Sequence, residues 1–438
     1  MKKALKGTAI AVAVSAALVL AGCSAPGAGN TGSTTSGWAA QNTNLKGTTL
    51  TIWAATNSNK TADSVITGFE KLTGATVKVQ TIPDPYEQGV QTKVATGNKP
   101  DLAFWQPTAS ELTSLNATTN LLPLTGAPWV SKYTGNLANF TGKLNGTRYA
   151  ALVTSPAVIG VFYNKEVLAK GGITTLPKNW TDLISDAKAL KAKGIDPFYE
   201  MGGDKWATQW WVQAQLADAA KNGLWTKINA NQAKFTDPTV QTAVDNYKNY
   251  IDEGLFNSDI KTATLQDQAT AILDGKAAMA LQVNSFFTTM QATSTTKELN
   301  QKIGFVPVGP TGNVGTYIPD QSNALVAFKT GNSKQESAAK QFLSYWMGQG
   351  YSGFVKSQST VSLEKGVATP SDVPTALKQV AASLDTSVGS MQALAVANPD
   401  LYIYLDNMIQ GTMTEKQVTQ ATQTQFAQLA KAEGVKGF

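Results

Sequence analysis

The reactive side chains of this sequence are few, and they exclude much of ordinary enzyme chemistry. The 438 residues include no histidine and a single cysteine, Cys23. Ser-His-Asp triads, histidine general bases and the usual zinc sites are therefore excluded. One cysteine also rules out an intramolecular disulfide and a thiolate metal site. We expect neither a cofactor nor a metal.

Cys23 follows an N-terminal apolar run. Three lysines precede an uncharged segment, residues 8–20, that is rich in Ala, Val and Leu. This pattern is typical of a secretory signal, and its apolar core is shorter than the ~20 residues of a spanning helix. Leu20-Ala21-Gly22-Cys23 resembles the lipobox of bacterial lipoproteins, which implies removal of residues 1–22 and acylation of Cys23, with palmitate among the acyl chains. The alternative is an ordinary signal peptide with an incidental cysteine.

The chain that remains after cleavage is large and close to neutral. It has 416 residues, which is more than one hydrophobic core usually serves, so two domains are expected. The net charge of +6 includes the three leader lysines, and the remainder implies no nucleic-acid partner. Residues 23–46 are rich in Gly, Ser and Thr, which predicts a flexible tether.

Strand and helix patterns alternate beyond the tether. Strands are predicted at residues 50–53, 77–79 and 101–106, with helices between them at 65–72 and 86–96. Strand, helix, strand, helix, strand at this spacing predicts a parallel sheet of the α/β class. Further strands are predicted at 149–153, 158–163, 303–306 and 324–328, and further helices at 181–193, 335–347 and 415–432.

Short motifs in a fixed order carry a resemblance to a known family. They include Leu50-Thr51-Ile52-Trp53, Asp101-x-x-x-Trp105, Phe162-Tyr163-Asn164-Lys165, Asp274-Gly275-Lys276-Ala277-Ala278-Met279 and Ile409-Gln410-Gly411-x-Met413-Thr414. Together they resemble the family 1 extracellular solute-binding proteins of sugar ABC transporters, the group that includes the maltodextrin-binding proteins. The resemblance implies two α/β lobes of the type II periplasmic-binding-protein fold, with a ligand cleft between them.

The resemblance also implies how the chain is divided and what it does. Lobe 1 would comprise residues 47–155 and 308–355, and lobe 2 residues 156–307 and 356–438, with one crossing near Pro307. The implied protein is a monomeric, non-enzymatic receptor, lipid-anchored on the extracytoplasmic face of the cell membrane. It would capture a neutral mono- or oligosaccharide by closing the cleft and deliver it to the permease subunits of an ABC importer.

A sugar site needs flat aromatic platforms and short polar side chains, because sugar rings have apolar C–H faces and many hydroxyls. Trp105 ends the predicted strand that begins at Asp101, and both are candidates for ligand contact. In the family, the matching tryptophan contacts sugar. Trp206 and Trp210 would share one face of a helix. The other candidates are Asn57, Ser58, Asn284, Phe286, Gln321 and Asn323. Core packing is the alternative for each tryptophan, and a solvated turn is the alternative for Gln321 and Asn323.

Two other functions remain open. One is the same fold with a non-sugar solute. A carboxylate or phosphate ligand would call for cationic side chains, yet Arg148 is the only arginine. The other is a surface-anchored glycosidase, which needs two carboxylates, although no pair among the 30 acidic residues stands out by its spacing. Since the chain lacks histidine, a neutral ligand predicts an affinity nearly constant from about pH 5.5 to 8, unless a cleft carboxyl has a raised pKa.

Overall fold

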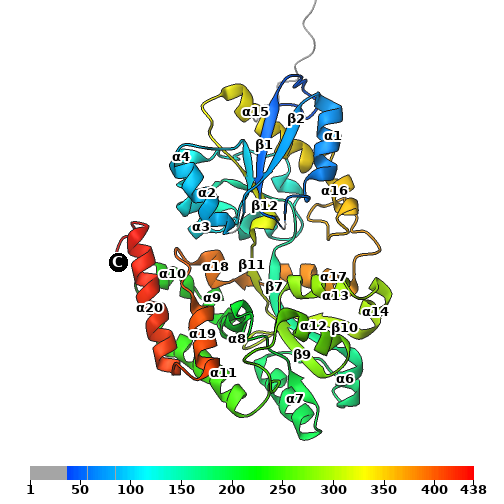
Figure 1. Ribbon diagram of the computed structural model, residues 1–438, viewed down its shortest axis with the longest axis vertical. Coiled ribbons are helices and arrows are strands. Elements are labelled where there is room, and N and C mark those ends of the chain that lie inside the picture. Colours follow the sequence, from blue (N-terminus) through cyan, green and yellow to red (C-terminus); the bar gives the residue numbers. More distant parts are fainter. Residues whose placement is uncertain (1–36, 57, 84) are drawn as a thin grey trace, which may run out of the picture. The chain divides into compact units, whose positions relative to one another are not determined.

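The computed structural model describes residues 37–438, apart from residues 57 and 84. The predicted signal peptide, the predicted acylation site Cys23 and the candidate Asn57 therefore lie outside the described residues. Within the described part of the chain, no helix has both the length and the apolar content needed to cross a membrane. The structure is mixed α/β, as predicted, and is built on two main sheets (Figure 1).

The first sheet has five strands in the order β2-β1-β3-β12-β6. β1 pairs in parallel with β2 and β3, which confirms the predicted strand–helix alternation, whereas β12 is antiparallel to β3 and β6. Every residue of β3, β6 and β12 is buried, as expected for strands covered on both faces. The elements are β1 (Thr49–Ala54), α1 (Asp63–Thr73), β2 (Thr76–Thr81), α2 (Tyr86–Ala95), β3 (Leu102–Phe104), β6 (Ala150–Leu152), β12 (Ala324–Ala327) and α15 (Ser333–Trp346).

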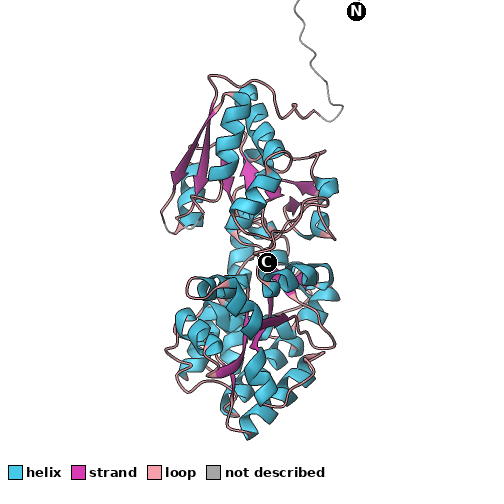
Figure 2. Cartoon of the chain, turned by 90° about the vertical axis from the view of Figure 1, so that its right-hand side faces the viewer, coloured by secondary structure: helices cyan, strands magenta, loops and turns pink. Residues whose placement is uncertain are grey.

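The second sheet is organised around β7 (Ala157–Asn164). This long, almost wholly buried strand pairs antiparallel with β9, β10 and β11, and β8 and β13 extend the sheet at its two edges. Figure 2 shows the strands of both sheets flanked by helices. The other strands are β8 (Asp196–Phe198), β9 (Ala277–Gln282), β10 (Ile303–Val306), β11 (Thr316–Ile318) and β13 (Val388–Gly389), besides a separate hairpin of β4 (Lys143–Leu144) and β5 (Thr147–Arg148).

Side-chain caps mark the starts of several helices. Thr414 precedes α20 and exchanges hydrogen bonds with Gln417, forming a capping box. Thr264 and Asp267 do the same at α12. The helices that follow β7 include α7 (Trp180–Ala192), α8 (Trp210–Gln215), α11 (Pro238–Asp252), α12 (Leu265–Leu273), α13 (Asn284–Gln291), α17 (Thr375–Ser383), α19 (Leu401–Gln410) and α20 (Glu415–Ala432).

Short helices complete the body. In the N-terminal part they are α3 (Ala109–Ser114), α4 (Ala117–Asn120), η1 (Val130–Lys132) and α5 (Leu137–Phe140). Further along they are α6 (Lys165–Lys170), η2 (Trp206–Gln209), α9 (Ala217–Lys221), α10 (Leu224–Asn229), α14 (Thr296–Lys302), η3 (Gln321–Asn323), α16 (Tyr351–Ser357), η4 (Leu384–Thr386) and α18 (Met391–Leu394).

The chain passes between the sheets at short segments. β6 of the first sheet is followed directly by β7 of the second, and β11 of the second by β12 of the first. β11 therefore belongs to the second sheet, although it lies in the range predicted for lobe 1, and the return crossing follows Ile318 rather than Pro307. The remaining lobe boundaries stay a prediction.

The end of the predicted tether is docked on the folded body. Trp38 is 5% exposed, meets Trp129 edge-on at 5.1 Å and donates a hydrogen bond from its indole nitrogen to the Thr125 carbonyl. The carbonyls of Gln41 and Thr43 accept hydrogen bonds from a side chain of α15. The prediction of a free tether reaching residue 46 is therefore wrong for this part, because a buried tryptophan and specific hydrogen bonds hold it.

Candidate ligand-binding cleft

A cavity of about 510 Å³ lies where the connections between the two sheets meet. We call it the main cavity. Its walls come from the end of β3, the β6–β7 crossing, η2 with α8, the start of α13 and the β11–β12 crossing. The lining residues are Gln106, Ser155, Ala157, Trp206, Trp210, Val283, Asn284, Ser285, Thr288, Ile318, Pro319, Asp320, Ser322 and Asn323.

Two tryptophans form the aromatic wall of the main cavity. The rings of Trp206 and Trp210 lie 6.0 Å apart at 67° to one another, and we refer to them as the tryptophan pair. Trp206 is half-buried and Trp210 is 5% exposed. The indole N–H of Trp210 is buried and has no hydrogen-bond partner among the described residues. An indole donor in that state is suited to a ligand oxygen or to water.

The loop before the tryptophan pair is tightly held. The N–H groups of Gly202 and Gly203 donate to the carbonyls of Ile260 and Ala263. A Cβ atom at either glycine would lie within 2.4 Å of a backbone carbonyl oxygen, so a larger residue would displace the loop. Lys205, with φ 64°, forms a 3.1 Å ion pair with the buried Asp406. These contacts fix where the aromatic wall begins.

A buried network of three glutamines supports the pair from behind. Gln213 donates to Gln392 at 2.8 Å and to Gln209 at 3.2 Å, and Gln392 donates to Gln209 at 2.6 Å. The Gln209 side chain in turn donates to the carbonyl of Trp206. Because buried amides are costly to leave unpaired, this closed network favours one position of η2 relative to α18.

A buried carboxyl lies deeper in the same lobe. Glu200 accepts hydrogen bonds from the indole of Trp211 and from the Met201 N–H, and Trp211 stacks on Tyr247 at 5.7 Å. Burial raises the pKa of Glu200 to about 7, although its hydrogen bonds act in the opposite direction. Trp211 is fully buried, so α8 presents Trp210 to the cavity and Trp211 to the core.

The lining from the β11–β12 crossing is largely polar. Residues 320–323, which we call the polar turn, are held by Asp320, whose carboxylate accepts from the N–H and hydroxyl of Ser322. Asn323 donates to Thr154 and to the Ser155 carbonyl, and its side-chain oxygen accepts from the Asp320 N–H. Among the described lining residues, Asp320 carries the only formal charge, so the lining offers hydroxyls, amides and backbone groups rather than cations.

The structure brings four of the predicted site residues together at the main cavity: Trp206, Trp210, Asn284 and Asn323. Asn284 lies at the start of α13, where its side-chain oxygen accepts from the Val158 N–H at 3.3 Å. Ser58 donates a hydrogen bond to Gln321 of the polar turn at 3.2 Å; both side chains are buried, and neither lines the cavity.

Three candidates are placed elsewhere. Trp105 is fully buried and donates to the Glu111 carbonyl, because β3 ends at Phe104 and the next side chain turns toward α3. Asp101 precedes β3, at the opposite end of that strand from the cavity, and binds the Thr51 N–H. Phe286 is fully buried, 5.4 Å from Phe162. The predicted ligand contacts of Trp105, Asp101 and Phe286 are therefore corrected to core or structural roles.

The sequence-based prediction missed several lining residues. Gln106 immediately follows Trp105, and Thr288 lies four residues after Asn284, so both are neighbours of candidates that were named. Helical spacing would have placed Thr288 on the same face as Asn284. Ser322 likewise lies between the candidates Gln321 and Asn323. Ser155 carries no such signal, because it lies in a crossing whose geometry depends on both sheets.

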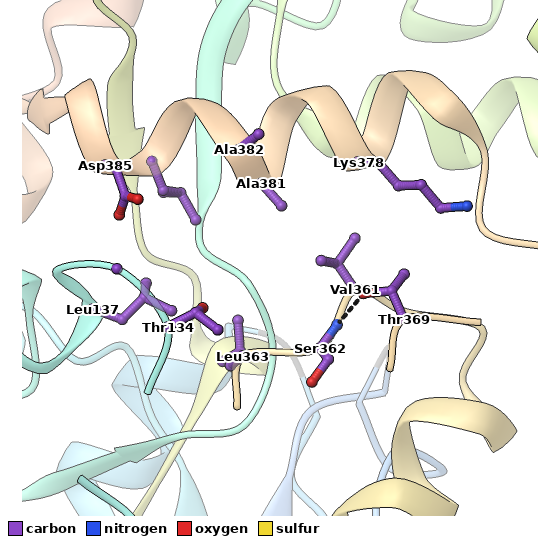
Figure 3. A pocket seen from close by; sticks show the side chains of 12 residues that line it. Thr134, Leu137, Val361, Ser362, Leu363, Thr369, Lys378, Ala381, Ala382 and Asp385 are labelled. Atoms are coloured by element: carbon purple, nitrogen blue, oxygen red, sulfur yellow. Dashed lines mark hydrogen bonds between the residues drawn. The ribbon is translucent and has the colours of Figure 1, made fainter. Parts of the chain in front are cut away.

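A second cavity, of about 310 Å³, lies beside α17 (Figure 3). Thr134, Leu137 and Leu363 line one side, and Lys378 and Asp385 come from the other. The Ser362 N–H donates to the hydroxyl of Thr369 there. No aromatic residue is among the described lining residues of this cavity, so it offers no platform for a ring. The main cavity is the stronger candidate site.

Two α/β units with a cavity at their crossings define a two-lobe binding protein of the type II solute-binding fold. The sequence matches the description "Bacterial extracellular solute-binding protein" over residues 53–351. This is more than half of the chain, and the protein therefore belongs to that family.

Relatives and solved structures agree with this assignment. Diacetylchitobiose binding protein DasA of Streptomyces coelicolor is 26% identical over 298 residues, which cover 65% of each chain. A chitin oligosaccharide binding protein superposes with a TM-score of 0.71 at 20% identity, over 87% of this chain and 99% of that one. The apo form of RafE from Streptococcus pneumoniae gives 0.72 at 17% identity, over 88% and 99%. The chain spans about half the length, 46%, of the first curated relatives it matches.

Proposed function

We propose that this protein is the lipid-anchored, sugar-binding component of an ABC importer and that the main cavity holds a neutral saccharide. The observation that carries the proposal is that the tryptophan pair and three residues of the polar turn line the same cavity. Aromatic faces pack against the C–H faces of a sugar ring, and hydroxyl and amide groups serve its hydroxyls. The cavity volume is within the range of roughly 300–1,000 Å³ of small-molecule sites.

The charge of the lining favours a neutral ligand. A carboxylate or phosphate is usually bound by Arg or Lys, and neither is among the described residues that line the main cavity. Asp320 accepts two hydrogen bonds from Ser322 and adds a negative charge, which opposes an anionic ligand. A glycosidase would need a second carboxylate near it. Binding is therefore favoured over hydrolysis.

The relatives narrow the saccharide class to be tested first. DasA is named for diacetylchitobiose, one solved structure for chitin oligosaccharide and another for raffinose. In this proposal the two lobes close on a short neutral oligosaccharide.

A thermal-shift screen tests the ligand class. The panel contains diacetylchitobiose, chitotriose, raffinose and maltotriose, with glucose 6-phosphate and glucuronate as charged controls. A ligand that binds only the native state at 100 times its Kd stabilises it by about 2.7 kcal/mol. We expect at least one neutral saccharide to raise the Tm and both anions to leave it unchanged. Stabilisation by the anions alone would contradict the proposal.

Delivery to a permease requires the receptor to stay at the membrane, and we propose that Cys23 provides the attachment. Stable anchoring takes two or more acyl chains, each buried methylene contributing ~0.8 kcal/mol. Cys23→Ser should release the protein to the medium or leave it unprocessed, as measured by fractionation and intact mass. A mature Cys23→Ser protein that still sediments with membranes would contradict the anchoring.

A further inference from the structure

Residues 37–46, which we call the strap, lie against the lobe built on the first sheet. Trp38 is 5% exposed between two partners, because Trp129 meets its ring edge-on and the Lys340 ammonium lies 5.3 Å from its ring centre. Its indole N–H donates to the Thr125 carbonyl at 3.1 Å. Edge-on aromatic and cation–π contacts both stabilise a ring in a defined position.

A buried side chain of α15 binds the middle of the strap. Gln341 is 1% exposed and donates to the carbonyls of both Gln41 and Thr43, at 3.1 and 2.8 Å. The side-chain oxygen of Gln41 also accepts a hydrogen bond from the Gln349 N–H, just beyond α15, at 3.1 Å. The strap therefore satisfies a buried amide of the body, which would lose its partners if the strap detached.

The last part of the strap continues into the sheet. The Leu45 N–H donates to the carbonyl of Thr73 at the end of α1, and the Leu45 carbonyl accepts from the Thr48 N–H. β1 begins at Thr49, immediately afterwards. From Trp38 to β1 the chain thus makes contacts with α1, α15 and the Trp129 region, all of which flank the first sheet.

We propose that the strap fixes the point at which the chain leaves the folded body, and that it holds the first-sheet lobe next to the membrane anchor. The proposal rests on anchoring at Cys23. The 14 residue steps from Cys23 to Gly37 reach at most about 50 Å, whereas a chain free up to Thr48 would reach about 90 Å. Docking therefore nearly halves the distance over which the body can move from its anchor.

This arrangement assigns different roles to the two lobes. The first-sheet lobe stays close to the anchored end, and the second-sheet lobe, which carries the tryptophan pair, makes the larger excursion when the cleft opens or closes. None of the strap contacts described above is to a residue that lines the main cavity, so we expect a change in the strap to leave the ligand site intact.

Hydrogen exchange on the full-length protein, extracted from membranes in detergent, tests the docking. The amides of Thr43 and Leu45, whose N–H groups donate to the carbonyls of Ala40 and Thr73, should exchange slowly in the natural protein. Trp38→Ala should accelerate their exchange by about tenfold or more, and Gln341→Leu by less, while Trp38→Phe retains most of the protection. Equal, fast exchange in the natural protein and Trp38→Ala would overturn the docking.

Energy transfer in reconstituted vesicles tests the orientation. Ser131→Cys in η1 and Ala192→Cys at the end of α7 each place one thiol-reactive donor on an exposed site, with an acceptor dye on the lipid headgroups. Transfer from residue 131 should exceed transfer from residue 192, and Trp38→Ala should reduce the difference. Equal transfer from both sites would overturn the orientation.

The results on strap docking and on membrane orientation can be distinguished from a failure of the proposed function. If Cys23 carries no lipid, the protein will not float with vesicles, which overturns both the anchoring and the membrane orientation. The exchange experiment still decides whether the strap is docked. Neither measurement uses a saccharide, so the result of the ligand screen has no bearing on them.

Discussion

The two walls of the main cavity are built on different principles. The tryptophan pair follows a loop held at Gly202 and Gly203 and is supported by a buried glutamine network. The polar turn is held mainly by hydrogen bonds within residues 320–323 and to the neighbouring crossing. The comparison indicates that one wall supplies a fixed platform for a ring and the other supplies the donors and acceptors that distinguish hydroxyl patterns.

A similar contrast separates two tryptophans that look alike in sequence. Trp105 has its indole N–H paired with the Glu111 carbonyl and no exposed surface, whereas Trp210 borders the cavity with its N–H unpaired by the described residues. Substitution of Trp105 should therefore reduce the stability of the fold, and substitution of Trp210 should weaken ligand binding. Four predictions, in order of decreasing effect, test this division.

Trp105→Ala should destabilise the fold by about 3–5 kcal/mol, because it leaves a cavity in the core of the first-sheet lobe. Chemical denaturation measures the loss. Trp105→Phe is the matched control and should bind saccharide with unchanged affinity if it folds. A folded Trp105→Phe protein with strongly weakened binding would return Trp105 to the site.

Glu200 should make folding stability depend on pH. Burial raises the pKa of its carboxyl to about 7 in the folded state, above the ordinary value near 4.5. The folded state then holds a proton that the unfolded state has lost, so stability is full below about pH 4.5. It falls as the pH rises toward 7, by on the order of 1 kcal/mol per pH unit. Denaturation curves from pH 4.5 to 8 measure it.

Glu200→Gln should make that pH profile less steep, since the neutral amide does not titrate. A natural protein whose stability is constant over this range would contradict the burial argument. The lack of histidine also predicts a ligand affinity that changes little with pH. Ligand affinity is a separate quantity from folding stability, and its constancy stays a prediction. Glu111 and Glu364 also have pKa values raised to about 7, chiefly by burial, so the absence of histidine does not mean that nothing titrates near neutrality.

Trp210→Ala should weaken saccharide binding by roughly 1–3 kcal/mol, the order of exposing a large apolar side chain. Calorimetry with the best saccharide of the panel measures the change, and Trp210→Phe should recover part of it. The melting temperature of the unliganded protein identifies any loss of folding. An unchanged Kd in a folded Trp210→Ala protein would move the platform elsewhere.

Ser322→Ala should have the smallest effect, about 0.5–1.5 kcal/mol of binding, because one hydroxyl of the polar turn is lost. Ser131→Ala, at an exposed serine outside the main cavity, is the matched control and should bind normally. If the polar turn distinguishes saccharides by the positions of their hydroxyls, the loss of affinity should differ between saccharides of the panel. A uniform loss would indicate only that the turn has been loosened.

The sequence predicted the fold well because the fold depends on local periodicity and on motifs. The alternation from β1 to β3 is confirmed, since strand and helix spacings repeat directly along the chain. The switch of β11 into the second sheet was not predictable, because its partner β7 lies far away in sequence. The docked strap was not predicted, because residues 23–46 are rich in Gly, Ser and Thr and include only one aromatic residue, Trp38.

Prediction of the site was less complete for a related reason. Residue type identified aromatic and amide candidates, but the direction of a side chain beyond a strand end depends on packing between elements. Trp105 and Phe286 turn into the core, while Trp206, Trp210, Asn284 and Asn323 line the main cavity. Ser58 and Gln321 interact with each other across 263 positions of sequence, a pairing that no local pattern reveals.

Hydrogen exchange with and without the saccharide selected by the screen locates the ligand, and so tests whether the saccharide binds in the main cavity. We expect slower exchange in four segments that line this cavity, residues 155–157, 206–215, 283–288 and 318–323. Segments 134–137 and 361–369, which line the second cavity, should be unaffected. Protection confined to those two segments, or none near the tryptophan pair, would contradict it.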